Sequence, residues 1–162
     1  MRMKFICDIM LGKLSTYLRM AGIDSAYSRF LSLPSLIKTA LAEDRCILTR
    51  RREIVLIDCP LSIYCVNSNY PHEQLKEVIT QFAISLDQSD YFSRCLLCNE
   101  SLKRIDKPEV IGKVPDYVTS TVSDFSQCPS CKKIYWKGTH YQNMLRQLHN
   151  LLHGAEINDE KR

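Results

Sequence analysis

The sequence predicts an α/β fold, with a mostly parallel sheet flanked by helices and a small cysteine-stabilised unit toward the C-terminal end. Short apolar runs alternate with helically spaced apolar residues over the first half of the chain. Strands that alternate with helices favour a parallel sheet joined by right-handed crossovers. The second half carries two Cys-x-x-Cys pairs. A chain of 162 residues is long enough for one ordinary core and one small metal-stabilised unit.

The composition argues against a membrane span and says little about partners. Hydrophobic residues make up 45% and charged residues 25% of the chain, as in globular proteins. No apolar run approaches the roughly 20 residues that a membrane helix needs. Acidic Asp8 closely follows the first basic residues, unlike a secretory signal, so we expect a cytoplasmic protein with reduced cysteines. The net charge of +4 fits a nucleic-acid partner and a plain solvated surface equally well.

The first elements are expected to be a strand, a helix, an extended piece and a second helix. An apolar strand over residues 3–7 is followed by Asp8 and by a helix that stops at Gly22. A short extended piece over residues 25–27 comes next, and Pro34 suits the first turn of the following helix.

Two further strands complete this half of the chain. One covers residues 46–48 and ends at Thr49, the other covers residues 62–66 and ends at Asn67, and a helix follows from about residue 71. Open parallel sheets place their sites at the carboxyl ends of the strands. The residues expected there are Asp8, Asp24, Thr49, Arg51 and Asn67.

The two Cys-x-x-Cys pairs predict one structural zinc site. A tight turn brings the two thiolates of each pair to the same side, and four thiolates close a tetrahedron that leaves no position for water. Zinc is favoured over a disulfide or a redox-active pair, because a cytoplasmic compartment keeps thiols reduced. The predicted ligands are Cys95, Cys98, Cys128 and Cys131. The remaining cysteines lie in or beside apolar strands and are expected to be inert; they are Cys7, Cys46, Cys59 and Cys65.

These elements predict four parts along the chain. Residues 1–84 form the α/β domain, residues 85–93 form a polar linker, and residues 94–144 form the zinc-binding unit. Residues 145–162 form a closing helix turned against the core, followed by a polar tail. The long interval between the cysteine pairs predicts a hairpin or a small insertion.

Cations alternate with aromatic side chains shortly after the last of these cysteines. Such a surface can follow a phosphate backbone and stack unpaired bases. Lys132, Lys133 and Lys137 are therefore candidates for contact with RNA. The structural alternative is that Tyr135 and Trp136 pack the core of the small unit, and we expect Trp136 to do at least part of that.

Several short motifs occur in order between residues 3 and 144. They are Phe5-Ile-Cys-Asp8, Met10-Leu-Gly-Lys-Leu14, Tyr17-Leu-Arg19, Gly22-Ile-Asp24, Ile47-Leu-Thr-Arg50, Arg94-Cys-Leu-Leu-Cys-Asn99, Val114-Pro115 and Tyr135-Trp-Lys-Gly138. Together they resemble the Mut-seven C-terminal RNase domain family. The resemblance implies a PIN-like α/β nuclease domain fused to a zinc ribbon, acting on RNA with Mg²⁺ or Mn²⁺. It also implies that Asp8 and Asp24 are catalytic carboxylates, with Asp8 as a ligand of the ion.

The chain departs from that family at an expected ligand and also before the second helix, where Leu31-Ser-Leu-Pro-Ser35 stands in place of the family's acidic residues. The family's Thr-Arg-Asp motif reads Thr49-Arg50-Arg51 here, so a cation replaces a carboxylate. Arg51 would form an ion pair with Asp8 and take over much of the ion's electrostatic role. Glu53, two residues further on, could replace the missing ligand.

Two functions from different classes therefore stay open. The first is a PIN-like, metal-dependent ribonuclease with Asp8, Asp24 and Glu53 at its centre and with activity weakened by Arg51. The second is an inactive nuclease-derived module that binds RNA or a protein partner. Without the resemblance, Asp8 would rather be a helix N-cap, and Asp24 could equally be a turn residue. The residues expected to contact RNA are Arg19, Arg50, Arg51, Lys132, Lys133 and Lys137. The sequence does not define the RNA substrate, endo- or exonucleolytic action, or the oligomeric state.

Overall fold

The computed structural model describes residues 3–56 and 60–153 and confirms the α/β class. Its main sheet is parallel, with strand order β2-β1-β3-β4. The strands are β1 (Phe5–Cys7), β2 (Ser25–Tyr27), β3 (Cys46–Thr49) and β4 (Ile63–Cys65). The central strands β1 and β3 are buried throughout, as expected for apolar strands of a parallel sheet that is covered on both faces.

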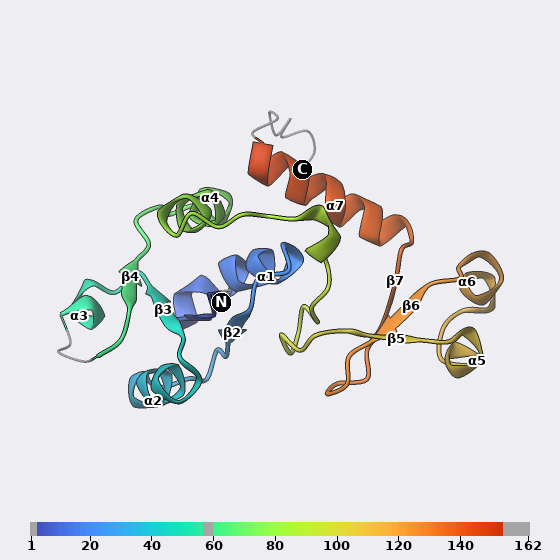
Figure 1. The fold of residues 1–162 in the computed structure, drawn as a ribbon, viewed down its shortest axis with the longest axis horizontal. Coiled ribbons are helices and arrows are strands. Elements are labelled where there is room, and N and C mark those ends of the chain that lie inside the picture. The colour runs from blue at the N-terminus through green and yellow to red at the C-terminus, as the bar shows by residue number, and fades with distance from the viewer. Residues whose placement is uncertain (1–2, 57–59, 154–162) are drawn as a thin grey trace.

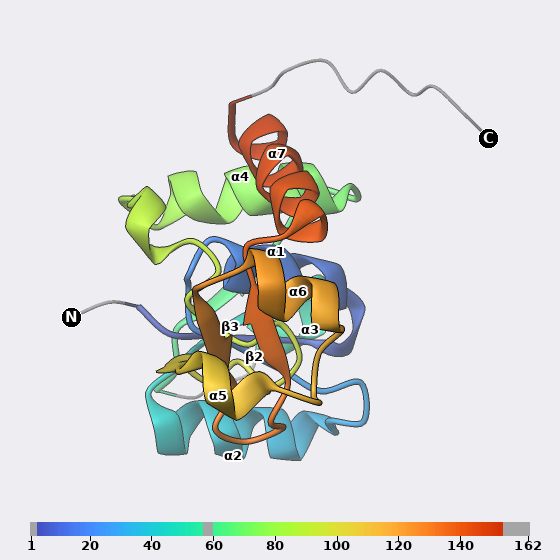
Figure 2. The ribbon, with the colours of Figure 1, turned by 90° about the vertical axis from the view of Figure 1, so that its right-hand side faces the viewer.

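Helices lie on both sides of this sheet. Its helices are α1 (Gly12–Met20), α2 (Leu33–Glu43), α3 (Arg52–Val55), α4 (Pro71–Gln81) and α7 (Thr139–His153), with short 3₁₀ turns η1 (Ile9–Leu11) and η2 (Gln88–Asp90). Figure 2 shows α2 below the sheet, and α1, α4 and α7 above it. Alternation along β1 explains the two cores, because Phe5 and Cys7 face α1 and α4 whereas Ile6 faces α2.

Two residues act at the ends of helices as the sequence predicted. Pro34 lies in the first turn of α2, where Ser32 caps the helix. Gly22 ends the α1 segment with φ of 80°. A Cβ atom at Gly22 would lie 2.3 Å from the carbonyl oxygen of Asp90. Only glycine fits this left-handed close approach.

A second sheet lies in the segment that we call the cysteine unit, residues 94–138. It is antiparallel, with strand order β5-β6-β7. Its strands are β5 (Lys103–Ile105), β6 (Phe125–Gln127) and β7 (Ile134–Trp136), and the helices α5 (Lys107–Val110) and α6 (Asp116–Thr121) lie between β5 and β6. A separate small core surrounds Phe125 and includes residues of α5 and α6. The insertion expected between the cysteine pairs is thus a pair of short helices.

The chain returns from the cysteine unit to the α/β core through α7 (Figure 1). This helix begins at Thr139, earlier than the apolar pattern from residue 145 indicated. Leu148 and Leu151 are buried in the same core as Phe5. The domain boundaries expected from the sequence stay a prediction, and the polar tail after His153 lies outside the described residues. In the described part of the chain, no helix has the length and apolar character needed to cross a membrane.

Candidate functional site

The carboxylate of Asp8 lies at the carboxyl edge of the main sheet, where β1 and β3 end side by side. Its side chain is 1% exposed. One oxygen accepts from the backbone N–H of Ile9, at 2.7 Å, which makes Asp8 the N-cap of η1. The other accepts from the hydroxyl of Thr49, at 2.9 Å. Asp8 therefore has the capping role that the sequence left open beside catalysis.

Arg51 completes the surroundings of this carboxylate. Its Nε and Nη2 atoms donate to Oδ2 and Oδ1 of Asp8, both at 2.7 Å, which is a two-pronged pair of the kind that guanidinium groups form with carboxylates. The hydrogen bonds to Asp8 raise the pKa of Arg51 above its usual value. The Arg51 backbone N–H also donates to the Thr49 hydroxyl. The predicted ion pair between Arg51 and Asp8 is thus confirmed.

These surroundings do not fit a catalytic divalent ion. Mg²⁺ and Mn²⁺ take several oxygen ligands, and both oxygens of Asp8 already accept from the protein. Glu53 lies exposed in the first turn of α3, and its charge helps to raise the pKa of Arg51. Among the described residues, no group of three or more carboxylate, imidazole or thiol side chains around Asp8 is close enough to hold an ion.

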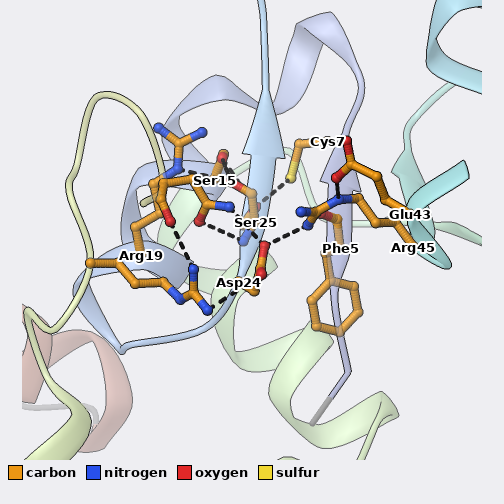
Figure 3. Close-up of polar contacts among 10 residues, drawn as sticks. Phe5, Cys7, Ser15, Arg19, Asp24, Ser25, Glu43 and Arg45 are labelled. Atoms are coloured by element: carbon orange, nitrogen blue, oxygen red, sulfur yellow. Dashed lines mark hydrogen bonds and ion pairs between the residues drawn. The ribbon is translucent and has the colours of Figure 1, made fainter. Parts of the chain in front are cut away.

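Asp24 lies at the opposite edge of the sheet, which corrects the placement expected from the sequence. It directly precedes β2, which runs parallel to β1, so Asp24 belongs to the amino edge. Its carboxylate accepts from Arg45 Nη1 at 2.5 Å and from Asn99 Nδ2 at 2.7 Å, and Arg94 Nη2 lies 3.3 Å away (Figure 3). Burial would raise the pKa of Asp24, but these partners lower it below the usual value.

Arg19 joins the same edge to the cysteine unit, which corrects its expected contact with RNA. The side chain is 4% exposed. Its Nε donates to the Ser25 carbonyl at 2.8 Å, and Nη1 donates to the carbonyls of Leu96 and Leu97 at 2.8 and 3.0 Å. Burial lowers the pKa of this guanidinium. Arg19 is therefore a buried structural residue, beside Asp24 in Figure 3.

The four predicted zinc ligands come together in the cysteine unit. The Sγ atoms of Cys95, Cys98, Cys128 and Cys131 all lie within 4.8 Å of one another. Those of Cys95 and Cys131 are 3.7 Å apart. A tetrahedron with zinc–sulfur distances of about 2.3 Å has sulfur–sulfur edges of about 3.8 Å. The donor set and its spacing therefore fit a zinc ion.

The two cysteine turns share one backbone pattern. In each turn, the first cysteine accepts from the residue after the second cysteine, and that residue has a positive φ, 69° for Asn99 and 62° for Lys132. The matching hydrogen bonds are Asn99 N to Cys95 O at 2.9 Å and Lys132 N to Cys128 O at 3.1 Å, together with Cys95 N to Glu100 O at 2.8 Å and Cys128 N to Lys133 O at 3.0 Å. This repetition explains how two separate segments present their thiols to one point.

Three residues whose roles the sequence interpretation missed lie in or beside this site. The Tyr135 hydroxyl lies 3.2 Å from Cys95 Sγ and accepts from the Leu96 backbone N–H at 3.3 Å. Burial would raise the pKa of Cys95, but hydrogen bonds from Tyr135 and from backbone N–H groups lower it to about 6. Asn99 and Arg94 hold Asp24. The position of Asn99 directly after a Cys-x-x-Cys pair was the available signal, because Asn tolerates positive φ.

The remaining residues expected to contact RNA differ in their freedom. Lys132 Nζ donates to the Pro129 carbonyl at 2.7 Å, Lys133 lies 5.7 Å from the Tyr135 ring centroid, and Lys137 lies 6.0 Å from that of Tyr141. All three lysines are exposed. Arg50 hydrogen-bonds the Asn69 side chain, and its Nε atom is buried without a hydrogen-bond partner in the structure. The three lysines remain the accessible cations of this set.

Comparison with known proteins identifies the family. Residues 3–148 match the family model described as the Mut7-C RNAse domain, which is most of the chain. No curated protein and no solved structure matches the sequence. The chain belongs to the Mut7-C RNAse domain family.

Proposed function

We propose that this member of the Mut7-C RNAse domain family binds RNA and that Arg51 suppresses metal-dependent cleavage at Asp8. Family membership supports a ribonuclease and RNA as its substrate. The observation that carries the proposal is the two-pronged ion pair between Arg51 and the buried carboxylate of Asp8.

The pair opposes metal binding in two ways. A divalent ion at Asp8 would have to displace Arg51 and so replace two charge-assisted hydrogen bonds, each worth on the order of 1.5–3 kcal/mol. The guanidinium would also repel an ion that approached while the pair was intact, because like charges at short range raise each other's energy. The chain therefore keeps the position of a nuclease centre and fills it with a cation of its own.

A second candidate is a metal-dependent ribonuclease that uses Asp8 and Glu53. It is favoured by the 28% exposure of the Arg51 side chain, which gives this residue room to turn outward. Glu53, two residues along the chain and exposed, would then be free to join Asp8. Asp24 takes no part in this candidate, because it lies at the opposite edge of the sheet.

The two candidates make opposite predictions for cleavage by the wild type, and Arg51→Asp tests whether Arg51 is the cause. We would incubate labelled single-stranded RNA and Mn²⁺ with the wild type and with the Arg51→Asp and Asp8→Asn variants, and follow cleavage and binding separately. We expect the wild type to bind without cutting and Arg51→Asp to gain cleavage that is lost again when Asp8→Asn is added. The matched control is Arg52→Asp, which makes the same charge change at the neighbouring exposed residue.

One result would favour the second candidate instead. If the wild type cuts RNA with Mn²⁺ and Asp8→Asn does not, Arg51 does not block the site and the proposal is wrong. Glu53→Gln would then test the replacement ligand.

Zinc, the RNA contacts and the compartment complete the proposal. A zinc ion held by the four cysteines would stabilise the cysteine unit without taking part in cleavage, since four thiolates leave no vacant position. Lys132, Lys133 and Lys137 would contact RNA. A cytoplasmic location is consistent with reduced ligand cysteines.

A further inference from the structure

A groove lies on the cysteine unit, and none of the four zinc ligands lines it. It is bounded by the connection between α5 and α6, by the end of β6, and by the turn into β7. Its volume is about 570 Å³, in the range of sites that hold small ligands or a segment of a larger one. The side chains that matter for its chemistry are Lys113, Gln127, Lys132, Lys133 and Trp136.

The charge of the groove selects an anion. The described residues that line it include three lysines and no carboxylate. All three lysines are exposed. Lys132 and Lys133 are partly fixed, the first by the Pro129 carbonyl and the second over the Tyr135 ring. Fixed cations lose less side-chain freedom when they bind a phosphate chain than free ones do.

Trp136 adds a flat apolar surface to these cations. It is partly exposed at the end of β7 and also packs against the small core around Phe125. Gly138 allows this position, because a Cβ atom there would lie 2.9 Å from Nε1 of the indole. The core around Phe125 therefore holds the Trp136 ring in place, and the ring also lines the groove.

We propose that this groove binds a single-stranded segment of RNA, with a base against Trp136 and phosphates at Lys113, Lys132 and Lys133. The inference rests on the proposed function in taking RNA as the ligand. Single strands present unstacked bases to aromatic side chains, whereas a duplex hides their faces. An acidic peptide would match the lysines but would leave the tryptophan and the apolar walls unused.

The groove is remote from Asp8. Figure 1 shows α5 and α6 at one end of the long axis of the molecule, and α3, which follows Arg51, at the other end. A short oligonucleotide in the groove therefore has its affinity set by the cysteine unit alone. Substitutions at Arg51 should leave that affinity unchanged, which separates this site from the one at Asp8.

Trp136 provides a direct test, because it is the single tryptophan of the sequence. We would titrate the zinc-loaded full chain with oligouridylate of about six nucleotides, without Mg²⁺ or Mn²⁺, and follow tryptophan fluorescence and the anisotropy of a labelled copy. We expect quenching that saturates with the same Kd as the anisotropy. Lys113→Ala should weaken binding several-fold and lower the dependence of log Kd on log salt by about 0.7. Lys76→Ala, at an exposed lysine of α4, should change neither.

The outcomes separate the groove from the proposed function. If anisotropy shows binding but tryptophan fluorescence does not change, the groove is not the binding site, although the protein still binds RNA. The same conclusion follows if the Lys113→Ala variant binds as tightly as the Lys76→Ala variant. Equal quenching by an oligoglutamate or by duplex RNA would refute the choice of ligand. Absence of RNA binding in every measurement, with longer RNA included, would refute the proposed function as well.

Discussion

Asp24 offers a sharp test of the site assignment, because its placement makes it structural. The Asp24→Asn substitution keeps the shape of the side chain and removes its charge. Arg45 and Arg94 then lose their shared anion, and their side chains are only 10% and 22% exposed. We expect the variant to unfold more easily while its affinity for RNA stays unchanged.

The expected loss of stability follows from the burial of Asp24, Arg45 and Arg94. Removing one partner of a fully buried pair costs about 3–5 kcal/mol. The Asp24 side chain is 17% exposed, and Arg45 keeps a second partner in Glu43, at 2.5 Å. We therefore expect a loss of about 2–3 kcal/mol, which lowers Tm by about 4–12 °C in a chain of this length.

The pKa of Asp24 predicts how its contribution to stability changes with pH. The pKa of Asp24 is lower in the folded protein than its ordinary value, so the charge stabilises the fold fully above the unfolded pKa of 3.8 and progressively less as pH falls through the folded pKa. The difference between wild type and variant should therefore shrink below about pH 4. Zinc is also released in acid, and Arg94 and Asn99 adjoin ligand cysteines, so the zinc content of both proteins has to be measured at each pH.

Urea unfolding of the zinc-loaded proteins between pH 7 and pH 3 would measure this difference. The control is Asp44→Asn, the same chemical change at an exposed residue with φ of 52°, where Asn is tolerated. A loss below about 0.5 kcal/mol at pH 7, or a loss that stays constant down to pH 3, would contradict the role of the Asp24 charge. If the Asp24→Asn variant is as stable as the wild type but loses RNA cleavage or binding, Asp24 is a functional residue and not a structural one.

Two further predictions concern the cysteines. Tyr135→Phe removes the hydroxyl that contacts Cys95, and we expect zinc affinity to fall by about tenfold or more, as measured by competition with a coloured chelator; an unchanged affinity would mean that the contact does not support the thiolate. Cys7 and Cys46 should resist a thiol reagent at pH 8 in the native protein, because burial raises their pKa values to about 11 and about 12. Mass spectrometry of labelled peptides would reveal the opposite result, in which either residue reacts as fast as the metal-free ligand cysteines.

The order of apolar runs and polar residues along the chain was sufficient to predict the main sheet and the position of Asp8 at its carboxyl edge. Apolar runs marked β1 and β3, and a polar residue that directly follows such a run must lie at the carboxyl edge of a parallel sheet. Asp8 met that condition and Asp24 did not, because Asp24 precedes its strand. Applying the same rule to residues 25–27 would have placed Asp24 at the amino edge.

Residues whose partners lie far along the chain could not be placed from the sequence. Arg19 looks like a surface cation of an amphipathic helix, yet the carbonyls that bury it belong to Leu96 and Leu97, far along the chain. Helix α5, in contrast, could have been predicted from local sequence. Asp106 and Glu109 form a capping box at its start, and an acidic residue followed three residues later by glutamate is typical of that motif. Cys59, expected to be inert, lies outside the described residues.

The return of α7 to the α/β core has a consequence for synthesis of the protein. Leu148 and Leu151 are buried beside residues of β1 and α1, so the main hydrophobic core is built from both ends of the described chain. A ribosome delivers β1 before the cysteine unit and α7 after it, and domains generally fold as units once their sequence is available. The N-terminal half must therefore wait, incompletely packed, while the whole cysteine unit is translated, and a nascent chain stalled before residue 139 should expose the surface that α7 would cover.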